Sequence, residues 1–157
     1  MTVTAELRAK VRELNQERRI DAVPGNQARA VEQWLDQAAR HLDSANTLAG
    51  DDPAMALEAI HQACRKSLVA HLLAAGWRPA GPNKHALMAD YGVVALAPYF
   101  TEDELLGLDI IRRFRNTTDY DDPTRTLAVQ QLQGLVTLAR RYHRAVTTNL
   151  PERIPAK

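Results

Sequence analysis

Two long amphipathic segments that follow one another directly are the feature that most constrains the fold of this chain. Small and apolar residues recur every three or four positions over about 24 residues ending at Gly50, which predicts an α-helix with one apolar face. The same pattern resumes at Pro53 and continues to Gly76. Gly50 is expected to end the first helix in the left-handed conformation, and the Asp51-Asp52-Pro53 sequence is expected to cap and open the second. So short a connection favours a bundle in which neighbouring helices run up and down.

Further helices are predicted on either side of this pair. Residues 4–20 form a charged segment with only a narrow apolar stripe, so we expect this helix at the surface or packed at an edge. Asn83 is expected to cap a short helix from Lys84 to about Leu96. A capping box, Thr101-Glu102-Asp103-Glu104, then opens a helix that ends near Asn116.

The remaining pattern and the composition predict an all-α fold. A last long helix is expected over residues 127–146, and no segment shows the alternation that is typical of a strand. The 45% hydrophobic and 25% charged content argues against disorder, and the 5% aromatic content favours closely packed helices. We therefore expect an N-terminal helix (1–22), an up-and-down bundle of four to five core helices (26–148) and a flexible tail (149–157).

Cysteine content and hydropathy bear on the compartment. Cys64 is the single cysteine of the chain, so no disulfide can form within it, which fits a reducing cytoplasm. Its helical context indicates a small buried side chain more than a reactive thiol. No signal peptide and no apolar run of membrane-spanning length is visible, so we expect a cytoplasmic protein that does not contact a membrane.

A cluster of arginines at the end of the predicted fifth helix is the strongest functional signal. Its candidate binding residues are Arg112, Arg113, Arg115, Asn116, Asp119 and Tyr120. Cations and hydrogen-bonding groups at a helix end suit an anion such as a phosphate, although arginines there also interact favourably with the helix dipole, and Asn116 and Asp119 are typical turn residues. Arg65 and Lys66 would extend the basic surface if their helix lies beside this one. A net charge of +1 means that any nucleic-acid binding depends on such a local patch.

The five histidines do not indicate a metal site. His61 and His71 lie too far apart on one helix to share an ion, and no Glu-x-x-His pairing supports a di-metal bundle. We expect neither a metal nor a cofactor. His85 follows a loop rich in Gly and Pro and is expected to be accessible, either as a boundary residue or as a group that contacts the ligand.

The overall layout resembles the HEPN superfamily over residues 26–148. The resemblance rests on the small-residue spacing of Ala38, Ala39, Leu42 and Ala45, the alanine-rich segment 59–64, the loop 81–85 with its histidine, and the cluster 112–120. It implies a bundle of four or five helices, frequently a homodimer. Many members are metal-independent ribonucleases whose signature is an arginine, a polar residue and, a few positions later, a histidine.

Applied to this chain, the resemblance implies specific roles. Arg115 and Asn116 match the start of the signature, where they would stabilise and orient a phosphate, whereas Tyr120 stands where the histidine is expected. A tyrosine has a pKa near 10 and moves protons poorly at neutral pH, so either Tyr120 or His85 would have to replace the histidine.

Two functional hypotheses follow. The first is a dimeric HEPN-like protein that binds RNA or nucleotides through the arginine cluster and His85, has weak ribonuclease activity or none, and serves in a toxin–antitoxin or defence system. The second is a non-catalytic interaction module whose motif is structural and whose partner is a nucleotidyltransferase-like antitoxin or a second copy. If the protein is paired with a nucleotidyltransferase, the resemblance makes Tyr120 the candidate residue for nucleotidylation.

Overall fold

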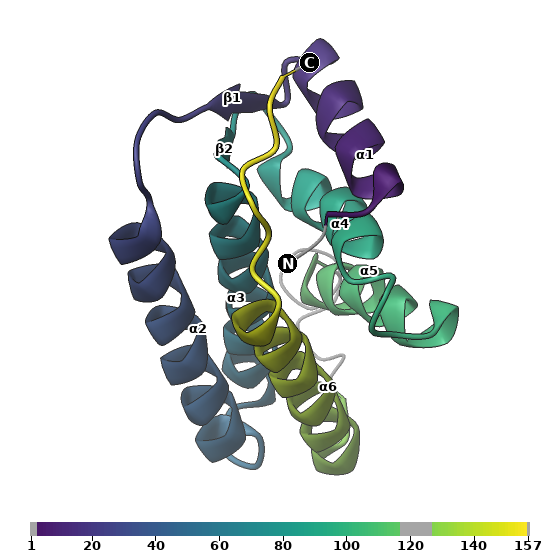
Figure 1. Ribbon diagram of the computed structural model, residues 1–157. Helices are drawn as coiled ribbons and strands as arrows, with labels where there is room; N and C mark the ends of the chain where they lie inside the picture. The colour runs from purple at the N-terminus through teal and green to yellow at the C-terminus, as the bar shows by residue number, and fades with distance from the viewer. Residues whose placement is uncertain (1–2, 117–126, 157) are drawn as a thin grey trace.

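The computed structural model describes residues 3–116 and 127–156 of the chain, with the side chains of Arg115 and Asn116 excepted. Within these residues the chain forms six α-helices and two short β-strands (Figure 1). In chain order they are α1 (Ala5–Gln16), β1 (Ile20–Ala22), α2 (Ala28–Leu48), α3 (Pro53–Ala74), β2 (Trp77–Pro79), α4 (Lys84–Ala95), α5 (Glu102–Asn116) and α6 (Val129–Thr148). The predicted all-α class is confirmed.

Helix α3 forms the centre of the bundle. It packs against α2 and α6 on one side and against α4 and α5 on the other, as Figure 1 shows. Thirteen of its 22 residues are buried, because a helix with neighbours on several sides needs apolar residues around most of its circumference. Helices α4 and α5 are therefore both held against α3.

A glycine allows α4 to approach α3 closely. A Cβ atom placed on Gly92 would lie 2.7 Å from a methyl group of Leu68 on α3 and 2.9 Å from a methyl group of Leu108 on α5. Protein interiors are packed too tightly to absorb such an overlap without movement. Gly92 thus sets the spacing among three helices at one point of contact.

Strands β1 and β2 were not predicted from the sequence. They pair antiparallel, with Ile20 opposite Pro79 and Ala22 opposite Trp77. Each strand has three residues, which is too short to show a recognisable alternation. The pairing ties the end of α1 to the loop after α3, and α1 itself packs against α4 with Leu7, Val11 and Leu14 buried, which agrees with the expected position at an edge.

The C-terminal segment, which was expected to be flexible, packs along this ribbon. Ile154 is 2% exposed, its N–H donates to the carbonyl of Ala75 (2.8 Å), and its own carbonyl accepts from the indole nitrogen of Trp77 (2.7 Å). The composition of the tail did not reveal this, because one backbone hydrogen bond, one hydrogen bond from the Trp77 indole and one buried side chain hold it.

Most predicted helix ends agree with the structure, but two details differ. Asp52 caps α3 by accepting from the Met55 N–H (3.2 Å), and the Thr101–Glu104 capping box forms as expected. Gly50, however, has no positive φ, because the N–H groups of Asp51 and Asp52 both reach the Leu48 carbonyl through a right-handed turn. Asn83 precedes α4 in the left-handed conformation (φ 59°), and its side chain makes no capping hydrogen bond.

No helix in the described part of the chain combines the length and the apolar character that crossing a membrane requires.

Candidate anion-binding site

The last turns of α5 position two arginines through one carboxylate. Asp109 lies 2.7 Å from Nη2 of Arg112 through one oxygen and 2.6 Å from Nε of Arg113 through the other. These are i,i+3 and i,i+4 pairs, the spacings at which side chains meet on a helix surface. The Arg113 side chain is 74% exposed, whereas that of Arg112 is 30% exposed, so the two guanidinium groups differ in their surroundings.

Arg112 lies in a cleft where α3, α4 and α5 meet. The cleft has a volume of about 20 Å³ and is lined by His61, Cys64, Arg65, Leu68, His85, Met88, Ala89, Leu108, Ile111 and Arg112. We call this cleft the anion cleft, after its polar residues His61, Arg65, His85 and Arg112. Nε of Arg112 is buried and forms no hydrogen bond with any described residue. A buried N–H of a cation without an acceptor is costly, so this group favours an acceptor supplied from outside.

Two histidines meet at the mouth of the cleft. The ring centroids of His61 on α3 and His85 on α4 are 4.9 Å apart, and the rings are inclined by 30°. His61 is 6% exposed, while His85 is exposed, as its position after the Gly/Pro loop predicted. One imidazole therefore faces solvent and the other supports it from inside.

Arg65 connects the cleft to the face between α2 and α3. Its Nε and Nη2 both donate to Oε1 of Gln62 (3.0 and 2.9 Å), which fixes the plane of the guanidinium. The same guanidinium lies 5.9 Å from the ring centroid of Trp34 on α2. Burial lowers the pKa of Arg65 from its ordinary value, but a guanidinium remains charged in proteins.

Lys66 adds a further cation beside Trp34. Its Nζ lies 5.9 Å from the centroid of the same indole and donates to Oε1 of Gln37 (3.0 Å) and to Nε2 of His41 (2.8 Å). Burial, together with the nearby charges of Lys66, Arg40 and Arg65, lowers the pKa of His41. Because the Lys66 ammonium can only donate, His41 accepts this hydrogen bond through Nε2 as a neutral imidazole.

Comparison with known proteins assigns the family. A model described as the HEPN domain matches residues 31–147, which is most of the chain. This chain belongs to the HEPN family. The crystal structure of TT1696 from Thermus thermophilus is similar in fold, with a TM-score of 0.58 and 23% identity over 75% of this chain and 96% of that one. A comparison with curated proteins gave no match.

The structure places only some of the predicted binding residues, and the residues matched to the HEPN signature are not among them. Arg112 and His85 both line the anion cleft. Helices α3 and α5 are neighbours, which is the condition under which Arg65 and Lys66 were expected to extend the basic surface. Arg113 instead projects outward from α5. The expected roles of Arg115, Asn116, Asp119 and Tyr120 concern side chains that lie outside the described residues.

His61 and Trp34, unlike Arg65, had not been predicted to take part in this site. His61 and Arg65 are four residues apart on α3, so the sequence did indicate that they share a helix face. The sequence did not indicate that Trp34 belongs to the site, because the position of Trp34 beside Arg65 depends on how α2 lies against α3. Cys64 also lines the cleft, but burial raises the pKa of its thiol to about 12, so it is a packing residue and not a nucleophile.

Proposed function

We propose that this HEPN protein binds RNA, with the anion cleft contacting a backbone phosphate. The observation that carries the proposal is Arg112, whose buried Nε has no acceptor among the described residues and whose guanidinium is oriented by Asp109. Phosphate oxygens are acceptors that a planar guanidinium binds well. Arg65 and the exposed His85 supply further donors within the same cleft.

The indole of Trp34 and the adjacent cations would serve the neighbouring nucleotide. Proteins that bind single-stranded nucleic acid combine cations for the backbone with aromatic rings on which bases stack. Trp34, Arg65 and Lys66 provide this combination beside the cleft. Our proposal is therefore for single-stranded RNA in preference to a duplex, with the polar residues from Arg115 to Tyr120 as further contacts.

A homodimer forms part of the proposal. Leu106 and Ile110 are 58% and 41% exposed and lie one turn apart on α5, so they form an apolar strip on the same helix as Arg112. A second copy that covered this strip would bring two sets of arginines close together. Light scattering of Leu106→Glu against wild type tests this point: we expect a dimer to become a monomer, and a monomeric wild type contradicts it.

Ribonuclease activity is a second candidate, favoured by the contact between His61 and His85. In RNA cleavage by internal transfer, a base accepts the 2′-hydroxyl proton while O2′ attacks phosphorus, and an acid protonates the 5′-oxygen as its bond to phosphorus breaks. Imidazoles perform both proton transfers, and a guanidinium stabilises the charge on the phosphorane oxygens. His85 would act at the substrate, with His61 positioning it.

The test of RNA binding is fluorescence anisotropy with a labelled single-stranded RNA. Arg112→Gln should weaken binding about tenfold, equivalent to about 1.4 kcal/mol, whereas Arg12→Gln, which removes an exposed arginine from α1, should change it less than about twofold. Equal affinities of wild type and Arg112→Gln would contradict the proposal. They would favour the interaction module, for which co-purification with a nucleotidyltransferase-like antitoxin is the next experiment.

A further inference from the structure

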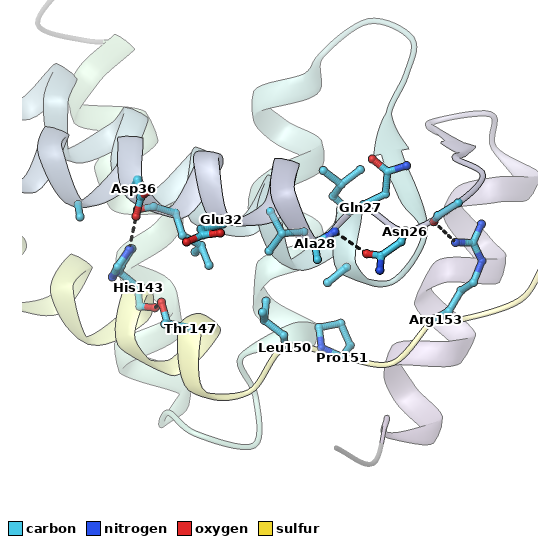
Figure 2. A pocket seen from close by; sticks show the side chains of 16 residues that line it. Asn26, Gln27, Ala28, Glu32, Asp36, His143, Thr147, Leu150, Pro151 and Arg153 are labelled. Carbon is cyan, nitrogen blue, oxygen red and sulfur yellow. Dashed lines mark hydrogen bonds between the residues drawn. The ribbon is translucent and has the colours of Figure 1, made fainter.

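A wide groove lies between α2 and α6, away from the anion cleft. Figure 2 shows Glu32 and Asp36 on the α2 side, facing His143 and Thr147 on α6, with Leu150 and Pro151 along the edge formed by the C-terminal segment. Its volume is about 610 Å³. Pockets of roughly 300–1,000 Å³ are typical of sites for small organic molecules.

The floor of the groove is apolar. Val31 and Leu35 of α2 and Leu73 of α3 line it, and they are 4%, 8% and 8% exposed. Leu150 and Pro151 add apolar surface from the other side. A ligand with an apolar body would remove this surface from water, which is favourable in proportion to the area covered.

The polar side chains around the groove are almost all committed to the protein itself. The guanidinium of Arg153 donates to the carbonyls of Val23 and Gly25, and Nε2 of His143 donates to the carbonyl of Leu35 (2.9 Å). The Thr147 hydroxyl donates to the carbonyl of His143 (2.8 Å). At the start of α2, the Asn26 side chain accepts from the Ala28 N–H (2.8 Å) and the Gln27 amide donates to the Pro24 carbonyl (2.7 Å).

Glu32 and Asp36 are different. Both are exposed, both line the groove, and neither forms an ion pair with a basic side chain of the described residues. They stand four positions apart on α2, a spacing at which two like charges repel each other. A cation placed between them would be attracted by both carboxylates.

We propose that this groove binds an organic cation with an apolar body, such as an alkyl or arylalkyl ammonium ion. The ammonium group lies at Glu32 and Asp36, and the hydrocarbon lies on Val31, Leu35 and Leu73. Residues 25–28 and 150–153, which complete the groove, lie outside the HEPN match of residues 31–147. The residues proposed to bind the ligand, Val31, Glu32, Leu35, Asp36 and Leu73, lie within that match. The groove shares no lining residue with the anion cleft, so the site is independent of the proposed RNA binding.

Isothermal titration calorimetry with three ligands of one chain length tests the proposal: n-octylammonium and octanoate below their micellar concentrations, and 1-octanol below its solubility limit. We expect saturable binding of one n-octylammonium per chain, at least about tenfold tighter than binding of the other two. If octanol binds as tightly as octylammonium, or octanoate binds more tightly, the groove does not recognise the ammonium charge. If octylammonium does not bind, the groove is not the proposed site.

Two variants locate the site. Glu32→Gln with Asp36→Asn should weaken octylammonium binding at least about tenfold, while the control pair Glu6→Gln with Asp51→Asn makes the same change in net charge elsewhere and should have no effect. Thr147→Trp fills the groove from an exposed position and should abolish binding, with circular dichroism to confirm the fold. If the control pair weakens binding as much as the groove pair, or Thr147→Trp leaves binding unchanged, the proposed location is wrong.

Discussion

His61 and His85 come from different helices and place their rings 4.9 Å apart at the mouth of a cleft that also contains Arg112. His61 is buried on α3, and His85 is exposed at the start of α4. The contact places an imidazole in the same cleft as an arginine of this HEPN protein.

This contact leads to a prediction about catalysis. If the protein cleaves RNA, His85→Ala should lower the cleavage rate about 100-fold, because a proton-transfer group is lost, and should weaken RNA affinity less than Arg112→Gln does, because the guanidinium remains. Arg112→Gln should lower both. The measurement is single-turnover cleavage of a labelled RNA together with anisotropy. An unchanged rate in His85→Ala would exclude His85, and a wild type without cleavage would remove the ribonuclease candidate while leaving the RNA-binding proposal to its own test.

The buried pair of His71 and Tyr91 predicts a loss of stability in acid. His71 Nδ1 lies 2.6 Å from the Tyr91 hydroxyl, and burial lowers the pKa of His71 from 6.5 to about 4. The unfolded chain therefore takes up a proton between about pH 6.5 and pH 4 that the folded protein does not. The free energy of unfolding should fall by about 3 kcal/mol from this group as the pH drops through that window.

Urea unfolding at a series of pH values measures this effect. The variant His71→Leu with Tyr91→Phe removes both polar groups together, so that neither remains buried without a partner. Its stability should fall less between pH 6.5 and pH 4 than that of wild type. Parallel pH profiles of the two proteins would show that His71 does not titrate as inferred.

Two glycines in helices should respond in opposite ways to the same substitution. A Cβ on Gly92 would overlap Leu68 and Leu108, so Gly92→Ala should destabilise the protein by about 1–3 kcal/mol. Gly134 on α6 has no atom within 4 Å of the corresponding position, so Gly134→Ala should stabilise it by about 0.5–1 kcal/mol. Thermal unfolding of both variants checks the pair, and destabilisation by Gly134→Ala would count against the described packing of α6.

Because the C-terminal segment is packed against the protein, we predict that shortening one of its side chains strongly lowers the free energy of unfolding. Ile154→Ala should lower the free energy of unfolding by about 2–4 kcal/mol, because Ile154 is buried where the tail meets Trp77. Pro155→Ala, at the next and exposed position, should change it by less than about 0.5 kcal/mol. The two values come from chemical unfolding followed by circular dichroism. Similar values for the two variants would indicate that the tail is not docked in solution.

The helices of this protein could be predicted from its sequence because each carries local signals. The periodicity of α2 and α3, the Asp52 cap and the Thr101–Glu104 box depend on residues close together in the chain. The β1–β2 ribbon and the docked Ile154 could not be predicted, because backbone hydrogen bonds between distant segments define them.

In the candidate site, too, some residues could be predicted from the sequence, whereas the contacts between helices could not. Arg112 was predicted from the charge at the end of α5, and the accessibility of His85 was predicted from the preceding loop. Their meeting with His61 and the position of Trp34 beside Arg65 depend on the packing of α2, α4 and α5 around α3. No spacing within a single helix contains that information.

The salt dependence of RNA affinity tests the central claim most directly. Binding of a phosphate by Arg112 releases a counterion, so the slope of log affinity against log salt should decrease in magnitude by about 0.7 in Arg112→Gln for a single strand and should stay unchanged in Arg12→Gln. We expect wild-type affinity to fall steeply with added salt. A slope near zero for wild type, or the same slope in wild type and Arg112→Gln, would contradict phosphate binding in the anion cleft.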